Sequence, residues 1–430
     1  MPQALVLGGY GLIGAECLSV LARAGYDVTG VGRSPQSAAR FPQYRWKHLN
    51  LTDLKQSQWD ALLSHADLVV NATGALQDGA KDTLTAIHVD VLKKLAQAAK
   101  HTGSRVVHIS AVGADTQATT DFLRTKAQGD AILAQSGADH VILRPAMVLG
   151  RDAYGGSALL RACAALPWIM PRIFEDSPVQ TVALSDVAQA VLLAANPKIP
   201  SGTVADLAES GSQSFDALAL RMRQWIGLPP PILRPRLSPW MLQGAASVGD
   251  GLGWLGWRAP LRSSAITVLK EGITAAPKPW QALSGQRCAT LHTTLSITPA
   301  TSQDRTAARL YLLMPLAIAT LAVFWVLSGT IGLLQLPEAA AVMINADTPP
   351  RLAELIVIAG AFADIALGGA ILIRRHTRRA AIGMVALSAA YLLGAALLTP
   401  ALFADPLGPM VKVLPGITLA AFVALLLEDR

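Results

Sequence analysis

The chain has 430 residues, of which 52% are hydrophobic and 15% are charged, and its formal net charge is +7. This length indicates more than one domain, and the apolar excess, which gathers after residue 310, is unusual for a soluble protein. No basic stripe with interleaved aromatics is present, which argues against nucleic-acid binding. The three cysteines form no CxxC pair, and no metal-binding histidine motif occurs, so we expect neither a disulfide framework nor a metal site.

Short apolar runs alternate with helix-like segments in the first half of the chain. This alternation predicts a doubly wound parallel sheet covered by helices on both faces. The expected strands are Ala4–Leu7, Asp27–Val31, Arg45–Leu49, Leu68–Asn71, Val106–Ser110, His140–Leu143, Val179–Leu184 and Thr203–Leu207. Helical patterns include Thr83–Lys100, Thr119–Gln135, Ser185–Ala194 and Ser214–Ile226.

A glycine-rich turn follows the first expected strand. Its glycines, Gly8, Gly11 and Gly14, lead directly into a helical pattern. Glycine permits a tight strand-to-helix turn and lets the backbone approach a pyrophosphate, which the free amides of the helix N-terminus can bind. We therefore predict a dinucleotide cradle that also includes the intervening Tyr10, Leu12 and Ile13.

The second expected strand ends at a basic residue. NAD-binding domains usually place an acid at this point to hold the ribose 2′-hydroxyl, whereas an arginine accommodates a 2′-phosphate. Here Arg33 and Ser34 follow Val31-Gly32. We therefore expect NADP as the cofactor, with NAD as the alternative.

Residues 227–304 are punctuated by prolines and are expected to be a Pro/Trp-rich connecting segment between residues 1–226 and a membrane domain at 305–430. Within this segment, Pro239–Trp257 has a helical pattern with three tryptophans. Two interpretations stay open for it: a helix at the membrane interface, where amphipathic rings are favoured, or a packing element of the globular domain.

The last part of the chain contains four apolar stretches, at Leu310–Leu336, Leu355–Ile373, Ala380–Ala404 and Val413–Leu427. A span needs about 20 apolar residues, so the first three qualify and the fourth is marginal. Together they predict a four-helix transmembrane bundle. Asp364 lies in the middle of the second stretch. Two interpretations stay open for it: a functional role, as a proton relay or a contact to a polar headgroup, or a hydrogen bond between helices.

Loop charge predicts the orientation of these spans. Residues 374–379, Arg-Arg-His-Thr-Arg-Arg, join the second and third stretches, and such a basic cluster is expected in the cytoplasm. Two expected spans lie between the N-terminal domain and this basic cluster. The domain is therefore expected on the same side of the membrane as the cluster. This arrangement is that of a multi-pass protein of a bacterial-type inner membrane.

The ordered motifs of residues 1–225 resemble an atypical or extended branch of the short-chain dehydrogenase/reductase superfamily, in the group that contains the NDUFA-nine-like accessory subunit of respiratory complex I. The motifs that carry the resemblance are the glycine turn, Asn71-Ala72-Thr73-Gly74, His108-Ile109-Ser110-Ala111, Lys126, and Arg144-Pro145 through Gly150. The resemblance implies cofactor contacts from Asn50, Leu51, Ala72, Thr73, Gly74, Lys126 and Pro145.

In that superfamily a Ser, a Tyr and a Lys carry the chemistry, which implies catalytic roles for Ser110 and Lys126. The Tyr normally stands four residues before the Lys, but this position is Phe122, which has no proton to exchange. Lys126 itself, Tyr154 or water remain as proton sources. The replacement of this tyrosine by Phe122 also weakens the interpretation as a sugar-nucleotide epimerase or dehydratase, because those reactions rely on the same tyrosine.

The C-terminal part resembles the DoxX-like family through Arg309-Leu310, Leu327-Ser328-Gly329 and its four-stretch length. The resemblance implies membrane redox metabolism linked to quinones. Two functional hypotheses follow. The first is an NADP-dependent oxidoreductase acting on a lipophilic or quinone-like molecule at the bilayer. The second is a non-catalytic NAD(P)H-binding sensor or assembly subunit, with a membrane redox complex as its partner.

Overall fold

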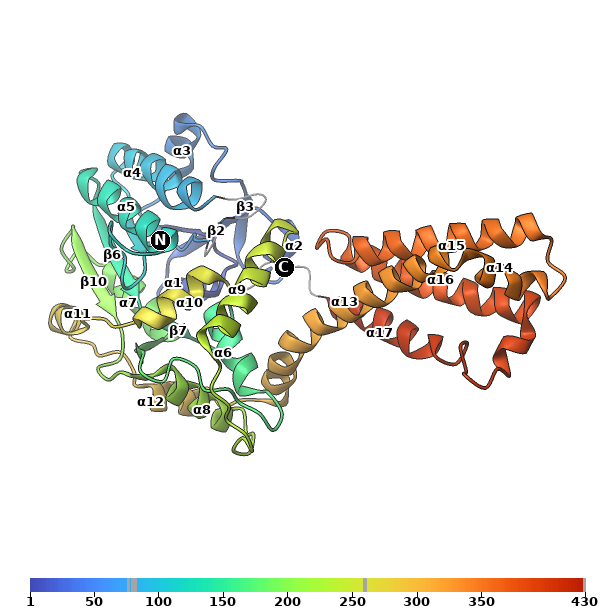
Figure 1. Cartoon of the computed structure of the whole chain (residues 1–430). Helices are drawn as coiled ribbons and strands as arrows, with labels where there is room; N and C mark the ends of the chain where they lie inside the picture. Colours follow the sequence, from blue (N-terminus) through green and yellow to red (C-terminus); the bar gives the residue numbers. More distant parts are fainter. Residues whose placement is uncertain (76–77, 79–82, 258–260, 428–430) are drawn as a thin grey trace. The chain divides into compact units, whose positions relative to one another are not determined.

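The computed structural model describes residues 1–75, 78, 83–257 and 261–427. The chain forms two compact units (Figure 1). The first consists of Met1–Gly251 and Ala259–Ala308, and the second of Leu252–Arg258 and Arg309–Arg430.

A seven-stranded parallel sheet forms the centre of the first unit. Its strands are β1 (Gln3–Leu7), β2 (Asp27–Gly32), β3 (Arg45–His48), β4 (Leu68–Asn71), β5 (Arg105–Ile109), β6 (His140–Pro145) and β10 (Thr203–Leu207). Their spatial order is β10-β6-β5-β4-β1-β2-β3. The order reverses between β1 and β4, as in Rossmann folds that bind dinucleotides at this switch point. The predicted doubly wound sheet is therefore confirmed.

Helices cover both faces of this sheet (Figure 1). On one face, α1 (Leu12–Arg23) and α7 (Leu184–Ala194) pack against the sheet through side chains such as Leu18 and Val187. On the other face lie α3 (Gln56–Leu63), α4 (Val91–Thr102) and α5 (Asp121–Gln135). Burial on both faces explains why the strands are continuous apolar runs rather than alternating patterns.

The helix expected at Thr83–Lys100 differs from the observed segment in its first turns. A short π-helix, η1 (Ala86–Asp90), precedes α4 and contains the buried His88. Such π-turns often mark functional positions, because the inserted residue redirects a side chain. Hydrophobic spacing does not distinguish this turn from an ordinary helix.

A smaller part of the first unit follows β6. Its strands are β7 (Met147–Leu149), β8 (Pro178–Val179), β9 (Thr181–Ala183) and β11 (Gln213–Ser214), so the single strand expected at Val179–Leu184 is two short ones. Its helices are α6 (Gly156–Ala164), α8 (Phe215–Trp225), α9 (Pro239–Trp254), whose end from Leu252 belongs to the second unit, α10 (Ser263–Glu271), α11 (Lys278–Ser284) and α12 (Leu291–Ile297). A short helix, α2 (Pro35–Ala38), also follows β2.

Much of the expected connecting segment packs into the first unit. Leu269 of α10 and Leu291 of α12 belong to one hydrophobic core, and Trp280 of α11 belongs to the core behind the sheet. Helix α9 differs, because Trp240 and Trp254 are 75% and 89% exposed. The interfacial and packing interpretations of α9 both remain predictions.

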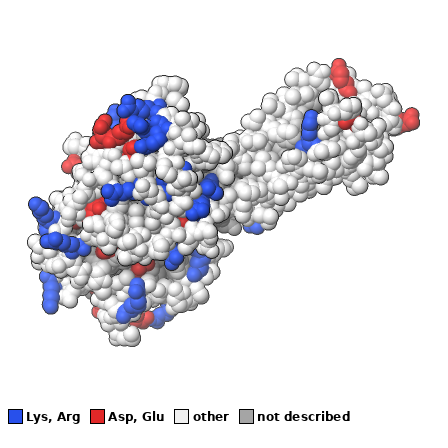
Figure 2. All heavy atoms as spheres, turned by 90° about the horizontal axis from the view of Figure 1, so that it is seen from below, with Lys and Arg blue, Asp and Glu red and all other residues white. Residues whose placement is uncertain are grey.

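The second unit is helical. Its elements are α13 (Ser302–Leu334), whose first turns belong to the first unit, α14 (Leu336–Ile344), α15 (Pro350–Ala370), α16 (Thr377–Leu398), η2 (Pro400–Phe403) and α17 (Val413–Leu426). Within the described residues, α13, α15 and α16 are long and apolar enough to cross a membrane, while α17 has only 14 residues. The face drawn in Figure 2 carries few charged atoms on this unit, as lipid exposure requires.

Three helices of the second unit meet at a polar cluster. The Asp364 carboxylate of α15 accepts hydrogen bonds from the Tyr391 hydroxyl of α16 at 2.7 Å and from the Ser328 hydroxyl of α13 at 3.0 Å. Gly329 allows this close approach, because a Cβ there would lie 2.4 Å from the Ala361 carbonyl oxygen. The structure thus contains the helix-to-helix hydrogen bonds that one interpretation of Asp364 requires.

Candidate functional site

The glycine turn joins β1 to α1 with no space for larger residues. Gly8 has a φ of +74°, and its amide donates to the Val31 carbonyl oxygen at 2.9 Å. A Cβ on Gly14 would lie 2.3 Å from the Gly8 carbonyl oxygen, so only glycine fits there. Helix α1 begins at Leu12 after Gly11, which has no side chain to cap the helix. The turn therefore has the shape and the amide groups that a pyrophosphate needs.

Tyr10 turns its ring toward the end of β2. A Cβ on Gly32 would lie 2.2 Å from that ring, and the Tyr10 hydroxyl accepts a hydrogen bond from the Arg33 amide at 3.1 Å. A second, longer hydrogen bond comes from the Ser34 amide at 3.4 Å. Arg40 donates to the Tyr10 carbonyl oxygen at 3.4 Å. The structure thus gathers Tyr10, Arg33 and Ser34 at the position where the adenosine ribose is expected.

The other predicted cofactor contacts follow β3 and β4. Asn50 donates from its side chain to Asp53 at 2.7 Å, and Leu51 is buried in the core beside α3. Thr73 donates its hydroxyl to the Asn71 side chain at 2.5 Å. Ala72 lies against the glycine turn, because a Cβ on Gly8 would lie 2.9 Å from the Ala72 carbonyl oxygen. The ends of β1 and β4 therefore meet closely at the switch point.

Ser110 directs its hydroxyl into the protein. The hydroxyl donates to the Asp130 carboxylate of α5 at 2.9 Å, and the Arg144 guanidinium of β6 donates to the same oxygen at 2.8 and 3.0 Å. His108 of β5 lies 3.6 Å from the other carboxylate oxygen. Burial raises the pKa of Asp130, while the Ser110 hydrogen bond and Arg144 oppose that shift. A buried network thus links β5, β6 and α5.

Lys126 is buried at the centre of the predicted site. Its ammonium group donates to the Ile109 carbonyl oxygen at 2.9 Å. A Cβ on Gly74 would lie 3.6 Å from this nitrogen, so the predicted residues Gly74 and Lys126 are neighbours. Burial lowers the pKa of Lys126 to about 8, although the Asp130 charge acts in the opposite direction. Burial therefore brings the pKa of Lys126 closer to neutral pH than that of an ordinary lysine.

Phe122 packs where the resemblance expects a tyrosine. Its ring meets the ring of His88 edge-on, with centroids 5.7 Å apart. The His88 Nε2 atom accepts a hydrogen bond from the Ala75 amide at 3.3 Å, and its Nδ1 atom lies 2.9 Å from the Thr125 hydroxyl. Burial and the nearby Lys126 charge lower the pKa of His88 to about 3, so His88 is neutral at physiological pH.

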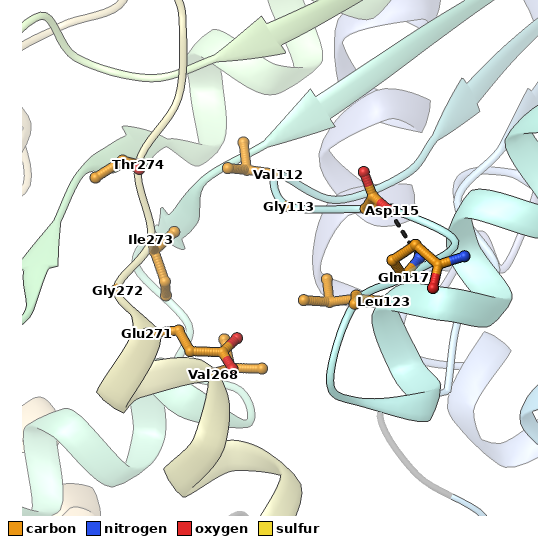
Figure 3. Close-up of a pocket in the computed structure, with 11 residues that line it drawn as sticks. Val112, Gly113, Asp115, Gln117, Leu123, Val268, Glu271, Gly272, Ile273 and Thr274 are labelled. Atoms are coloured by element: carbon orange, nitrogen blue, oxygen red, sulfur yellow. Dashed lines mark hydrogen bonds between the residues drawn. The ribbon is translucent and has the colours of Figure 1, made fainter.

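A pocket of about 370 Å³ is lined by Leu123, the residue that follows Phe122 in α5 (Figure 3). Leu123 of α5 faces Val268 and Glu271 of α10 across it, and the loop after β5 contributes Asp115 and Gln117 (Figure 3). The complete described lining is Val112, Gly113, Asp115, Gln117, Ala118, Leu123, Val268, Glu271, Gly272, Ile273 and Thr274. This lining is mainly apolar, includes two carboxylates and contains no Lys or Arg.

Two groups of residues near the predicted site were not predicted from the sequence. Asp130 stands one helical turn after Lys126, a spacing that places both on one face of α5 and that could have signalled the network. His88 and the α10 side of the pocket have no local sequence signal. In the described part of the chain, no group of three His, Cys, Asp or Glu side chains is arranged to hold a metal ion.

Two parts of the chain match known protein families. Residues 8–195 match a family of NAD(P)H-binding domains, and residues 322–421 match the DoxX-like family. The mitochondrial NADH-ubiquinone oxidoreductase 40 kDa subunit of Neurospora crassa is 26% identical over 201 residues, which are 44% of this chain and 50% of that protein. NADH dehydrogenase (ubiquinone) 1 alpha subcomplex subunit 9 of Rattus norvegicus is 28% identical over 162 residues, 35% of this chain and 41% of that protein.

The chain thus spans about half or less of the length of these relatives. Among solved structures, MoeE5 in complex with UDP-glucuronic acid and NAD has a TM-score of 0.52 at 19% identity, covering 68% of this chain and 96% of that one. This likeness establishes the fold.

The chain therefore joins a region that matches NAD(P)H-binding domains, and that is similar to complex I subunits, to a region that matches the DoxX-like family. Both predicted resemblances are confirmed, as is an NAD(P) cofactor. The preference for NADP, the catalytic roles of Ser110 and Lys126 and the individual cofactor contacts stay predictions.

Proposed function

We propose that this protein is a membrane-anchored, NADP-dependent oxidoreductase that acts on an uncharged, lipophilic substrate such as a quinone. The observation that carries the proposal is the buried Lys126 ammonium group, which lies next to Gly74 and three residues along α5 from the pocket residue Leu123. A titratable cation with a lowered pKa, one helical turn from a pocket residue, supports a role in proton transfer.

The glycine turn and the end of β2 would hold the cofactor. The first-turn amides of α1 would bind the pyrophosphate, and Arg33 would meet a 2′-phosphate. When bound, a reduced nicotinamide supplies a hydride. The absence of an acid at the end of β2 supports NADP rather than NAD.

Lys126 would supply the proton that Phe122 cannot. As the hydride reaches the substrate, the Lys126 ammonium group would release a proton to the substrate oxygen and take another from solvent. Transfer of one hydride and one proton converts a quinone to a quinol. The pKa of about 8 supports this role, because both protonation states of Lys126 are accessible near neutral pH.

The pocket chemistry favours an uncharged molecule. Asp115 and Glu271 would repel a nucleoside diphosphate, whose phosphates need cationic or amide partners. Val112, Leu123 and Val268 offer apolar contact instead. The lining therefore supports a quinone-like substrate over the UDP-sugars found with MoeE5.

The membrane part supports a bilayer-delivered substrate. Three apolar helices and the DoxX-like match are consistent with membrane association. The basic run at 374–379, between α15 and α16, supports a cytoplasmic position for the nucleotide-binding unit in a bacterial-type inner membrane.

A turnover assay on the full chain in lipid nanodiscs tests the proposal. We expect NADPH fluorescence to be quenched on binding, and NADPH to be consumed when decylubiquinone is added. Lys126→Met should reduce the turnover rate by at least about 100-fold, within the usual range for a lost acid–base group. Lys93→Met, at an exposed position of α4, is the matched control and should retain activity. NADPH binding without any wild-type turnover would reject the enzymatic proposal.

A second candidate is a non-catalytic NAD(P)H-binding subunit of a membrane redox complex. The packing of Phe122 against His88, at the position of the usual tyrosine, favours it. The relatives named as subunits of NADH-ubiquinone oxidoreductase also support it. Co-purification of the full chain with a respiratory complex, together with NADPH binding and no turnover, is the result expected from this candidate.

A further inference from the structure

We propose that the first unit contacts the bilayer surface through an exposed apolar edge, defined here as Trp168, Ile169, Ile232 and Leu233. These side chains are 70%, 43%, 75% and 58% exposed, respectively. Large apolar side chains exposed together usually mark an interaction surface. The proposal is independent of whether the protein turns over a substrate.

Backbone hydrogen bonds hold the two segments of this edge together. The Ile232 and Leu233 amides both donate to the Trp168 carbonyl oxygen, at 2.7 and 3.0 Å. Ile169 and Leu233 form a parallel β-bridge. The edge is therefore a joined structure rather than two separate loops. Trp168 has a φ of +56°, a conformation rare for a bulky residue that the surrounding bonds must maintain.

Arginines border the apolar edge. Arg172 pairs with Arg236 in a second parallel bridge, and Glu175 accepts from Arg172 at 3.5 Å and from Arg236 at 3.1 Å. Tryptophan beside long cationic side chains suits the zone between headgroups and acyl chains, where rings stay amphipathic and charged ends reach water. Because Glu175 offsets one of the two arginine charges, most of the contact is expected from the apolar residues.

The position of the apolar edge in the chain and its core indicates that a bilayer covers it. Met170, next to Ile169, belongs to the same hydrophobic core as Ala308 of α13. Arg305 of this helix donates to the Ile226 carbonyl oxygen at 3.0 Å, which ties its first turns to the first unit. Only Arg309 separates Ala308 from the apolar run that begins at Leu310. A membrane surface is therefore expected a short distance from this core.

Lipid quenching of a site-specific label tests the proposal in the full chain. Ile232→Cys would carry an environment-sensitive fluorophore, and the protein would be placed one chain per nanodisc in phosphatidylcholine with or without brominated acyl chains. Val204→Cys on β10, whose parent side chain is 45% exposed, is the matched control. Labelling of the unmodified chain gives the background from Cys163 and Cys288, which are partly buried.

We expect brominated lipid to quench the label at position 232 at least about threefold more than the label at position 204. Equal quenching at both positions would overturn the proposal. A label at 232 that is shielded from water but not quenched by brominated lipid would also overturn it, because the edge would then be covered by protein. Both parent side chains are exposed, so neither substitution should disturb the core.

Discussion

The Ser110 hydroxyl donates a hydrogen bond to the Asp130 carboxylate across 2.9 Å, with both side chains buried. The same carboxylate receives two hydrogen bonds from Arg144. One side chain of α5 therefore connects the carboxyl ends of β5 and β6. This connection fixes the backbone around Ile109, whose carbonyl oxygen in turn holds the Lys126 ammonium group.

Asp130→Asn should destabilise the first unit by about 2–4 kcal/mol, because the partly buried Arg144 guanidinium would lose its charged partner. Chemical denaturation followed by tryptophan fluorescence measures the change. Asp121→Asn is the matched control, since Asp121 pairs with Arg124 at the exposed start of the same helix and should cost about 0.5 kcal/mol. Equal losses for both variants would show that the Asp130 network contributes no special stability.

Lys126 should make folding stability depend on pH. Its pKa is about 8 in the folded state and 10.5 for an unperturbed lysine, so the unfolded chain binds more protons between these values. Stability is therefore expected to rise with pH across the window from 8 to 10.5, by about 3 kcal/mol in total if only this group titrates. Lys126→Met should remove this rise in a denaturation series. An unchanged slope in the variant would refute the assignment to Lys126.

Gly14→Ala should weaken NADPH binding by at least about tenfold. The new Cβ would lie 2.3 Å from the Gly8 carbonyl oxygen, so the glycine turn must shift and its amides lose their positions. A fluorescence titration with NADPH measures the effect. Gly244→Ala provides the control, because a Cβ there meets no atom within 4 Å. Unchanged affinity in the Gly14 variant would exclude this turn as the pyrophosphate site.

Sequence patterns were sufficient for the central sheet, and the reason is physical. Buried parallel strands are short apolar runs, and the expected Leu68–Asn71 and Thr203–Leu207 match β4 and β10 in both bounds. The glycine turn was also recognisable, because its function depends on residues adjacent in the chain. Gly74 and Lys126 were predicted for one site and do lie side by side.

Long-range arrangements were less accessible to sequence reasoning. Arg144 and Asp130 lie on different elements, so no local pattern reports their pairing. The prolines of residues 227–304 predict a connecting segment, and within it Leu269 and Leu291 fill a core that this pattern does not reveal. Isolated apolar residues between prolines show no helical or strand periodicity. Their place in the core is visible only from the residues that pack against them.

Asp364→Leu should destabilise the second unit by about 1–2 kcal/mol, because the Tyr391 and Ser328 hydroxyls would lose their acceptor in an apolar setting. Asp364→Asn keeps a carbonyl acceptor of the same shape and should cost less. Thermal unfolding in nanodiscs compares the two variants. If both variants unfold at the wild-type temperature, the cluster does not hold the three helices together.

The pH dependence of NADPH oxidation tests the central claim most directly. With decylubiquinone as acceptor, kcat should be constant below pH 7 and fall as the pH rises through about 8, because the Lys126 ammonium group is the proton donor. In the Lys126→Arg variant the guanidinium group stays protonated to higher pH. The kcat of the remaining activity should therefore fall at a higher pH than in the wild type. A wild-type kcat that does not change between pH 6 and about 10 would contradict the account.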